Sequence, residues 1–208
     1  MLDMLINDFG YNTPIFLNEL RVEGITESAL RQNFRRMVEK GSIVRFDDGI
    51  YYIPKTSVLF NKPMSLDETE VIIAKYIRRD EQVYGYYTGM TFANQIGVTT
   101  QVPVLDEITT NKESSKGRNV SLSGSKLRLK CPKVPVTKEN WKLLQLLDLL
   151  NELEKWSELS KEEAYEKIAY CIKERGLKRD DMTSYVGAYP NKVSKTLIES
   201  RLVYVFAS

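Results

Sequence analysis

The sequence predicts an α+β fold in two parts: helices and a hairpin within residues 1–60, then a mixed α/β domain over residues 64–208 that is helical toward its end. A segment with helical periodicity, residues 26–39, is followed at once by two β-prone runs around an Asp-Gly turn. Strand patterns gather between residues 82 and 131. From residue 140 onward the apolar residues recur mostly at helical spacing.

Composition places the chain among globular proteins. It has 208 residues, of which 42% are hydrophobic and 28% charged, enough for one large or two small cores. No stretch is long and apolar enough to cross a bilayer, and the start, MLDMLINDFG, lacks the features of a secretion signal. Cys131 and Cys171 lie far apart and have no second pair, which favours free thiols in a reducing compartment. We therefore expect a cytoplasmic protein without a membrane partner.

The sequence contains no histidine. This excludes Ser-His and Cys-His nucleophilic pairs and the common zinc sites within the chain. Neither a Walker-type phosphate loop nor a dinucleotide fingerprint is present. We expect no catalytic residue, no metal and no cofactor, although carboxylate chemistry through residues such as Asp106 and Glu107 stays formally open.

The first domain begins with two short predicted helices. Residues 1–9 place their apolar side chains on one side, and Gly10 ends this helix. Thr13-Pro14 supplies a cap and a first-turn proline for a second helix, in which Ile15, Phe16 and Leu20 point inward.

A third helix over residues 26–39 and the hairpin after it complete this domain. Thr26 is the expected N-cap, and the buried face consists of Ala29, Leu30, Phe34, Met37 and Val38. The outer face carries Arg31, Gln32, Arg35 and Arg36. Lys40 and Gly41 end the helix, and strands on either side of Asp47-Asp48-Gly49 form the hairpin. The order helix, helix, helix, hairpin is that of a winged helix-turn-helix.

The outer face of residues 26–39 suits a DNA major groove, where Arg pairs with guanine and Gln with adenine. Two alternatives stay open. A basic outer face is often simply solvated, and winged helices also dock proteins.

The second domain follows a predicted linker, residues 56–63. A capping box from Ser65 to Glu68 is expected to open a helix through about Arg79. A short strand over residues 82–88 and a helix over residues 91–96, ended by Gly97, come next. Further strands are predicted at residues 104–110, 120–123 and 126–131.

A basic stretch coincides with these strands. Residues 108–142 contain nine Lys or Arg and only two Glu. Strict alternation over residues 126–131 places Lys126, Arg128 and Lys130, here called the basic ladder, on one face of a strand. Three further cations lie nearby in the sequence: Lys112, Lys116 and Arg118. Together with the basic ladder they are a possible contact for a partner or for nucleic acid. An ordinary solvent-facing strand is the alternative.

The C-terminal region is predicted to be helical. Residues 140–156 form a helix that must be buried nearly all round, because its polar side chains make only a narrow stripe of Lys142, Gln145, Asp148, Asn151 and Glu152. A capping box from Ser160 to Glu163 opens another helix that ends near Gly176. Two short helices are expected over residues 180–187 and 191–201.

Three blocks in this order resemble the AbiEi-type antitoxins of bacterial type IV toxin–antitoxin systems. The blocks are ALRQNFRRMVEKGSIVRFDDGIYYIP, then YYTGMTFANQIGVTTQVP with ITTN shortly after, then PVTKENWKLLQLLDLL. The resemblance covers roughly residues 15–155.

The resemblance implies a transcriptional autorepressor and antitoxin. Its winged helix would bind inverted repeats in its own promoter, and its second domain would counteract a nucleotidyltransferase toxin without necessarily forming a stable complex. By position, the residues that would face DNA are Thr26, Ser28, Arg31, Gln32, Arg35 and Arg36, and Arg45 would approach a phosphate. Asp47 and Asp48 depart from this pattern, since they place negative charge at the wing tip.

The chain does not itself carry the toxin's motif, because no Asp-x-Asp follows Gly124-Ser125. An alternative function is a winged-helix interaction module without sequence-specific DNA binding. In that case the basic ladder would contact an acidic partner.

Overall fold

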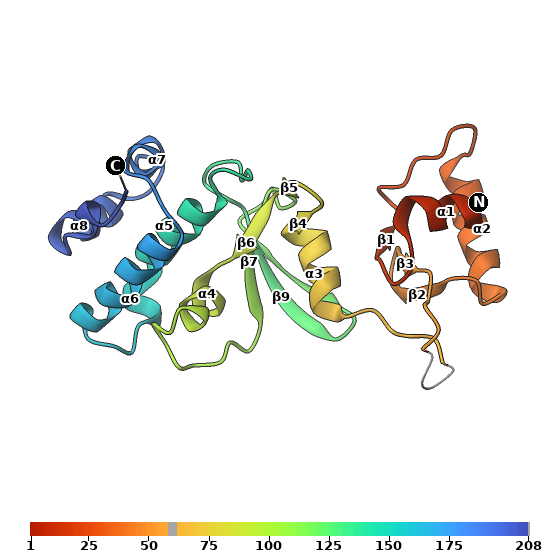
Figure 1. The fold of residues 1–208 in the computed structure, drawn as a ribbon, viewed down its shortest axis with the longest axis horizontal. Helices are drawn as coiled ribbons and strands as arrows, with labels where there is room; N and C mark the ends of the chain where they lie inside the picture. Colours follow the sequence, from red (N-terminus) through yellow and green to blue (C-terminus); the bar gives the residue numbers. More distant parts are fainter. Residues whose placement is uncertain (58–61, 208) are drawn as a thin grey trace. The chain divides into compact units, whose positions relative to one another are not determined.

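The computed structural model describes residues 1–57 and 62–207. They form an α+β protein with two compact units, Met1–Ala74 and Lys75–Ser208 (Figure 1). The sequence placed the domain boundary between residues 60 and 64, whereas the division in the structure falls later, inside a helix. Each unit is described by itself.

The first unit combines helices with a three-stranded sheet. Its elements up to residue 52 are α1 (Leu2–Phe9), β1 (Ile15–Phe16), α2 (Glu27–Glu39), β2 (Val44–Asp47) and β3 (Ile50–Tyr52). The sheet order is β1-β3-β2, and both pairings are antiparallel. The predicted first helix, the helix over residues 26–39 and the hairpin around Asp48-Gly49 are confirmed.

The predicted helix from Thr13 to Leu20 is wrong. Ile15 and Phe16 instead form β1, which pairs with Tyr51 and Ile50 of β3. Both side chains are buried, and a β-branched and an aromatic residue fit a strand that completes a sheet. The Thr-Pro signal for a helix start was therefore overridden by tertiary pairing.

The core of the first unit lies between α1, α2 and the sheet. Phe34 of α2 is fully buried, and its ring meets that of Tyr51 edge to face at 5.0 Å. The other buried side chains of this core are Leu5, Ile15, Leu17, Leu30, Ile43 and Ile53. Because Leu30 and Phe34 anchor α2 from one side, the helix has only one side left for solvent.

Helix α3 (Glu68–Tyr76) differs from its predicted form at both ends. Asp67, and not Ser65, caps it by accepting hydrogen bonds from the backbone of Thr69 and Glu70. It ends before Arg78-Arg79, which form strand β4 with β5 as partner. Of the linker predicted over residues 56–63, residues 58–61 lie outside the described residues; its ends, Thr56 and Pro63, form an isolated bridge.

The second unit contains a mixed sheet and a group of helices. Its elements are β4 (Arg78–Arg79), β5 (Gln82–Val83), β6 (Gly85–Tyr87), α4 (Gly89–Gln95), β7 (Asp106–Thr110), β8 (Arg118–Leu122), β9 (Ser125–Lys130), α5 (Trp141–Trp156), α6 (Lys161–Glu174), α7 (Arg179–Val186), α8 (Asn191–Glu199) and a short 3-10 helix (Leu202–Tyr204). The four-stranded sheet has the order β6-β7-β9-β8, with β7 and β9 parallel and the other pairs antiparallel. The predicted strands over residues 104–110, 120–123 and 126–131, the helix α4 and the C-terminal helices are confirmed. The single strand predicted over residues 82–88 is instead divided at Tyr84 into β5 and β6, because β5 pairs with β4 and β6 pairs with β7.

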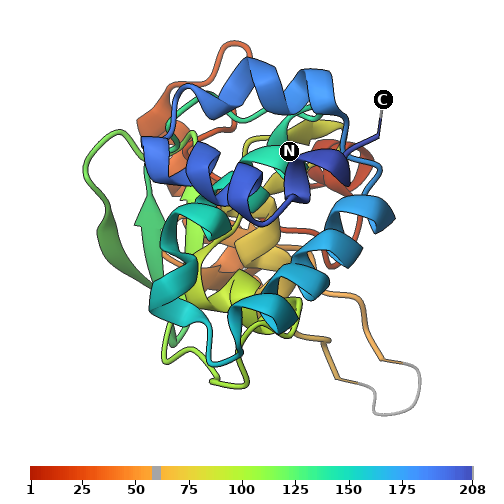
Figure 2. The ribbon, with the colours of Figure 1, turned by 90° about the vertical axis from the view of Figure 1, so that its left-hand side faces the viewer.

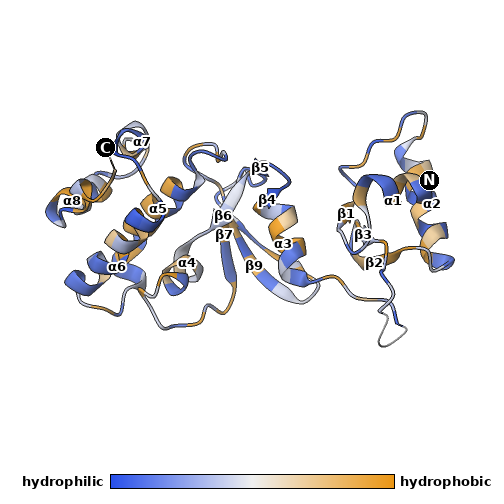
Figure 3. Ribbon diagram, in the orientation of Figure 1, coloured by the Kyte–Doolittle hydropathy of each residue, from blue (hydrophilic) through white to orange (hydrophobic). Residues whose placement is uncertain are grey.

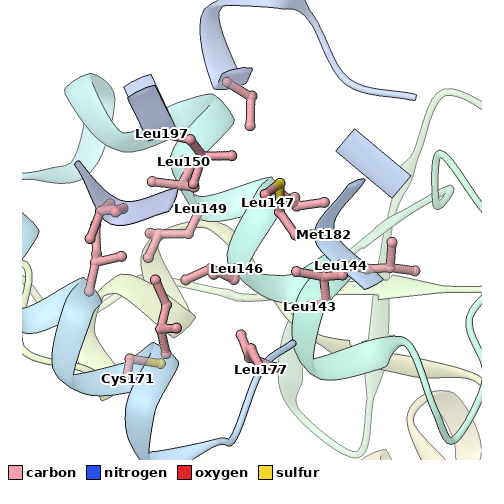
Figure 4. Close-up of a cluster of buried hydrophobic side chains, with 14 of the residues drawn as sticks. Leu143, Leu144, Leu146, Leu147, Leu149, Leu150, Cys171, Leu177, Met182 and Leu197 are labelled. Carbon is pink, nitrogen blue, oxygen red and sulfur yellow. The ribbon is translucent and has the colours of Figure 1, made fainter. Parts of the chain in front are cut away.

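Helix α5 is the centre of the second unit's core. Its leucines are buried on several sides, as the sequence predicted, and share one core cluster with residues of the later helices such as Ile168, Val193 and Leu197. Figure 4 shows Leu197 of α8 beside Leu150 of α5. Those later helices, α6 to α8, stand nearest the viewer in Figure 2. The predicted capping box at Ser160 and Glu163 is present and begins α6. Of the two free cysteines, Cys171 is buried and Cys131 is exposed.

Across the described residues, none of the helices is both long enough and apolar enough to span a bilayer.

Candidate functional site

The outer face of α2 is exposed and polar. Arg31, Gln32, Arg35 and Arg36 are all exposed, whereas Leu30 and Phe34 on the opposite side are buried. The structure therefore brings four of the predicted DNA-contacting side chains onto one helix face.

The start of α2 holds two more of the predicted residues. Thr26 caps the helix, since its hydroxyl oxygen accepts a hydrogen bond of 3.3 Å from the backbone N–H of Ala29. Ser28 is exposed in the first turn. Thr26 thus has a structural role of its own, whatever it contacts.

Two of the arginines on this face form ion pairs along the helix. Arg31 lies 3.8 Å from Glu27, and Arg35 lies 3.0 Å from Glu39, in each case four residues apart. Such exposed pairs are weak and exchange readily for another anion. Arg36 makes no ion pair within the described residues. The face can therefore present three guanidinium groups to a phosphate or a base.

Arg45 on β2 is held at the hairpin turn. Its guanidinium pairs with the carboxylate of Asp48 and donates a hydrogen bond of 3.4 Å to the backbone oxygen of Asp47. The negative charge that the sequence placed at the wing tip is thus partly neutralised within the hairpin. Arg45 is correspondingly less available to a DNA phosphate.

The basic residues of the second unit do not act as one group. Lys112 lies over the ring of Tyr84 at 4.5 Å, and Arg118 pairs with Glu113 at 2.8 Å. Lys126 is exposed at the start of β9. Only three of the six predicted cations, Lys116, Arg128 and Lys130, line a common cavity.

This cavity, here called the β9 cavity, has a volume of about 270 Å³. It lies between the end of the sheet and α5, and its lining comprises Thr88, Thr109, Ser115, Lys116, Arg128, Lys130, Cys131, Lys133, Asp148, Asn151 and Glu152. The loop that carries Lys116 reaches it because Gly117 adopts a φ of +108°, and a Cβ there would lie 2.7 Å from the backbone oxygen of Leu129. The strands beside the cavity, β7 and β9, are mostly hydrophilic in colour in Figure 3.

Three register partners on neighbouring strands, Tyr86, Thr109 and Lys130, form a polar row across the sheet toward α5. The Tyr86 hydroxyl donates to Asp148 at 2.9 Å, and the Thr109 hydroxyl does so at 3.1 Å. Thr88 adds a third bond of 3.3 Å to the same carboxylate oxygen. A buried carboxylate is tolerated here because several hydroxyl groups solvate it.

Burial and hydrogen bonding have opposite effects on the pKa of the Asp148 carboxyl. Burial raises the pKa of its carboxyl above the ordinary value, although the bonds from Tyr86 and Thr109 and the charge of Lys130 offset part of this effect. Burial also raises the pKa of the Tyr86 hydroxyl, and the nearby Asp148 charge adds to that rise. Tyr86 is therefore a protonated hydrogen-bond donor at neutral pH and not a nucleophile.

Lys130 joins the polar row to two further carboxylates. Its ammonium group lies 3.4 Å from Glu107 and 3.3 Å from Glu152. Burial by itself would raise the pKa of Glu152, but the charge of Lys130 and a hydrogen bond from Trp156 outweigh it and hold that pKa below its ordinary value. The space for the Glu107 carboxylate exists because residue 89 is a glycine with φ +57°, and any Cβ there would collide with it.

The carboxylates considered for catalysis do not form a pair. Asp106 and Glu107 are neighbours on β7, so their side chains project to opposite faces of the sheet. Asp106 accepts a hydrogen bond from Thr91, whereas Glu107 faces Lys130. In the part of the chain that is described, His, Cys, Asp and Glu nowhere gather in threes as a metal ion would require.

Sequence reasoning missed Lys133, Asp148, Asn151 and Glu152 as members of a site. Three of them belong to the polar stripe of α5, which the sequence did show. A polar stripe on an otherwise leucine-covered helix was the signal, since buried polar groups need partners. Thr88 and Thr109 carried no comparable signal.

These features define a two-unit α+β protein that has an exposed basic helix in one unit and a polar cavity in the other. The chain belongs to a family of unknown function, DUF6088, whose model matches residues 11–177. The match extends over most of both units, from the turn before β1 to just beyond the end of α6. No curated protein matches the chain.

Proposed function

We propose that the chain is a DNA-binding transcriptional autorepressor that also serves as a type IV antitoxin. The observation that carries the DNA-binding half is the outer face of α2. There Arg31, Gln32 and Arg35 stand exposed on a helix that Leu30 and Phe34 anchor from behind.

The dimensions of α2 suit a major groove. Its 13 residues give a length of roughly 20 Å, and a groove about 12 Å wide admits a helix. Guanidinium groups pair with guanine edges or with phosphates, and the amide of Gln32 matches an adenine edge. The ion pairs with Glu27 and Glu39 are weak enough to be replaced by such contacts.

The arrangement around α2 supports a winged-helix interpretation of the first unit. The hairpin β2–β3 follows the helix directly, and β1 completes the sheet on the other side of β3. Between β1 and α2, a turn that begins at Leu17 occupies the place where a short second helix was expected. On this interpretation the turn replaces the second helix and α2 is the recognition helix.

The antitoxin half rests on the three sequence blocks that resemble AbiEi-type antitoxins. They extend from α2 through α4 and β7 to α5, so the resemblance includes both units. The partners of the protein would then be double-stranded DNA of its own promoter and, functionally, a nucleotidyltransferase toxin.

The test is fluorescence anisotropy of the full chain against a labelled fragment from directly upstream of its own gene, with scrambled DNA as control, over a range of salt. Sequence-dependent binding that weakens with salt is expected. Arg31→Ala and Arg35→Ala should each cost ~1–3 kcal/mol where they touch bases.

A matched control is Lys195→Ala on α8. Lys195 is exposed and pairs with Glu199 four residues later at 3.7 Å, much as Arg31 pairs with Glu27. This variant should bind DNA like the unchanged protein. Equal binding by all three variants would remove the DNA-binding assignment.

A second candidate function, a winged-helix module that docks a protein, is favoured by the charge balance of the first unit. Arg31, Arg35 and Arg45 each have an acidic partner, which reduces attraction to a polyanion. A charge reversal at Lys126 and Arg128 of the basic ladder would separate the two functions. Lys130 is left unchanged because its ion pairs with Glu107 and Glu152 are needed inside the fold. Loss of rescue from the toxin with repression intact would assign the ladder to partner binding.

A further inference from the structure

The β9 cavity has chemistry that the proposed function does not use. We propose that it binds a small phosphorylated molecule of about the size of a mononucleotide or sugar phosphate, with its phosphate at Lys116, Arg128 and Lys133 and its hydroxyl or amino groups at Asn151. This site is independent of the DNA-binding face of α2, and its test is independent too.

The cationic wall of the cavity is largely uncompensated. Lys116 makes no ion pair in the described part of the chain, and Arg128 donates only to the neutral side chain of Asn119, at 3.3 Å. Lys133 lies over the ring of Tyr189 at 5.7 Å. Like charges that converge on one recess repel each other, and an anion between them removes that repulsion.

Lys130 differs from these three cations. Its ammonium group is already shared by Glu107 and Glu152 and is largely buried, with 23% of its side chain exposed. It therefore serves the fold, and the phosphate is assigned to the other cations. A phosphate monoester carries close to two negative charges at neutral pH and accepts several hydrogen bonds, which matches three cationic donors.

The wall of the cavity formed by α5 carries hydrogen-bond acceptors, which a phosphate group alone would not satisfy. The side-chain oxygen of Asn151 is buried and has no hydrogen-bond partner among the described residues. An unpaired buried acceptor is uncommon and destabilising. Asp148 and Glu152, on the same helix, also present carboxylates to the cavity. A ligand that fits both walls carries hydrogen-bond donors beside its phosphate, as a ribose or a base does.

The size of the cavity favours a small ligand over a nucleic-acid strand. Its volume of about 270 Å³ lies just below the usual range for small-molecule sites, so it suits only a small ligand. The oxygen of Asn151 is covered in the unliganded chain, so a ligand bonds to it only once the amide turns toward the cavity, which a small molecule inside the cavity allows and a strand lying across the surface does not.

Cys131 provides a reporter of occupancy. Its thiol is exposed and lines the cavity, whereas Cys171 is buried in the helical core, where burial raises its thiol pKa. A thiol reagent should therefore react first at Cys131. A ligand in the cavity should slow that reaction and leave slow labelling of Cys171 unchanged.

The experiment uses the full chain with the four ribonucleoside 5′-monophosphates, ribose 5-phosphate, inorganic phosphate and unphosphorylated nucleosides. Binding is measured by calorimetry and by the labelling rate of Cys131. At least one phosphorylated organic compound is expected to bind about tenfold or more tightly than inorganic phosphate, and the nucleosides are expected not to bind. If inorganic phosphate binds as tightly as every organic compound, or if none slows labelling, the proposal is overturned.

Variants assign the binding to the cavity. Lys116→Gln and Lys133→Gln should each weaken binding by about tenfold. The matched control is Lys126→Gln, because Lys126 stands on the same face of β9 as Arg128 but does not line the cavity. An equal loss in this control would show nonspecific attraction by the basic ladder and would overturn the proposal.

Asn151→Leu tests the acceptor wall. The folded protein loses no hydrogen bond to the Asn151 oxygen, so the variant should unfold at the same or a higher denaturant concentration. Its affinity for the organic phosphate should fall to that for inorganic phosphate. Unchanged affinity would contradict the assignment, as would tighter binding of a short single-stranded RNA than of any monophosphate. Arg31→Ala should leave all these results unchanged, so failure here says nothing about DNA binding.

Discussion

The hydroxyl of Tyr86 on β6 donates a hydrogen bond of 2.9 Å to the buried carboxylate of Asp148 on α5. Most of the surface of α5 packs against apolar side chains, which would tolerate small rotations and shifts of the helix, and polar bonds such as this one hold it at a limited number of points. A directional hydrogen bond from the sheet to one carboxylate allows far fewer orientations and positions of the helix. The bond therefore places the polar stripe of α5, and with it Asn151 and Glu152, against the end of β9.

Removal of the Tyr86 hydroxyl should destabilise the second unit. Tyr86→Phe keeps the ring in a site that is 1% exposed but removes one donor from Asp148. We expect a loss of about 1–3 kcal/mol in the free energy of unfolding, measured by urea denaturation. Tyr204→Phe, at a position that is 73% exposed, is the control and should change little. Equal stability of the two variants would show that the bond contributes nothing.

Glu158 should make the stability of the second unit depend on pH in the acid range. Hydrogen bonds from the backbone of Thr100 and the side chains of Gln101, Thr100 and Thr99 lower its pKa from the ordinary 4.5 to about 2. Because the pKa is lower in the folded protein, the stabilisation is complete above pH 4.5 and is lost as the pH falls toward 2.

The melting temperature between pH 2 and pH 6 tests this effect. Glu158→Gln should lower it at pH 6 and reduce its fall in acid. Glu154→Gln is the control, since Glu154 is also exposed and makes no hydrogen bond in the described residues. A parallel fall in the Glu158→Gln variant and the unchanged protein would contradict the prediction.

Local patterns predicted most of the elements. Periodicity located α2 and α5, and the capping box at Ser160 located the start of α6, because these signals act within a few residues. The failures came where a distant partner decided the outcome. Ile15 and Phe16 became a strand because β3, more than thirty residues later, offers them a free edge.

The cavity was only half predictable for the same reason. Alternation correctly placed Lys126, Arg128 and Lys130 on one face of β9. No local pattern could show that Lys116 and Arg128 meet at one recess while Arg118 turns to Glu113. The outcome depends on the parallel pairing of β7 with β9 and on the path of the chain at Gly117.

Truncating a buried leucine of α5 should lower the free energy of unfolding far more than truncating an exposed apolar residue of α8. Leu146 is fully buried in the core of the second unit (Figure 4), whereas Ile198 on α8 is 66% exposed. Leu146→Ala should lower the free energy of unfolding by about 2–5 kcal/mol, and Ile198→Ala should change it by less than about 0.5 kcal/mol. Denaturant titrations of both variants check this. Similar values would place α5 outside the core.

Substitutions of Lys130 and Lys126 should differ in their effect on the stability of the protein, although both residues lie on the same face of β9. Lys130→Gln leaves Glu107 and Glu152 without their common cation in a partly buried setting, so we expect a loss of about 1–3 kcal/mol. Lys126→Gln removes an exposed charge and should be close to neutral. The two are compared by urea denaturation at neutral pH. A neutral Lys130→Gln would show that the carboxylates need no partner.

Thr26 allows the cap of α2 to be separated from its proposed contact with DNA. Thr26→Ala removes the acceptor for the Ala29 N–H and should cost about 0.5–2 kcal/mol of stability. Thr26→Asp keeps an acceptor there and adds a negative charge that favours the helix start, so its stability should match that of the unchanged protein. The same charge would face the DNA backbone, so promoter binding by Thr26→Asp should weaken, measured by anisotropy. If Thr26→Asp is stable and binds the promoter at full strength, the start of α2 does not lie against DNA.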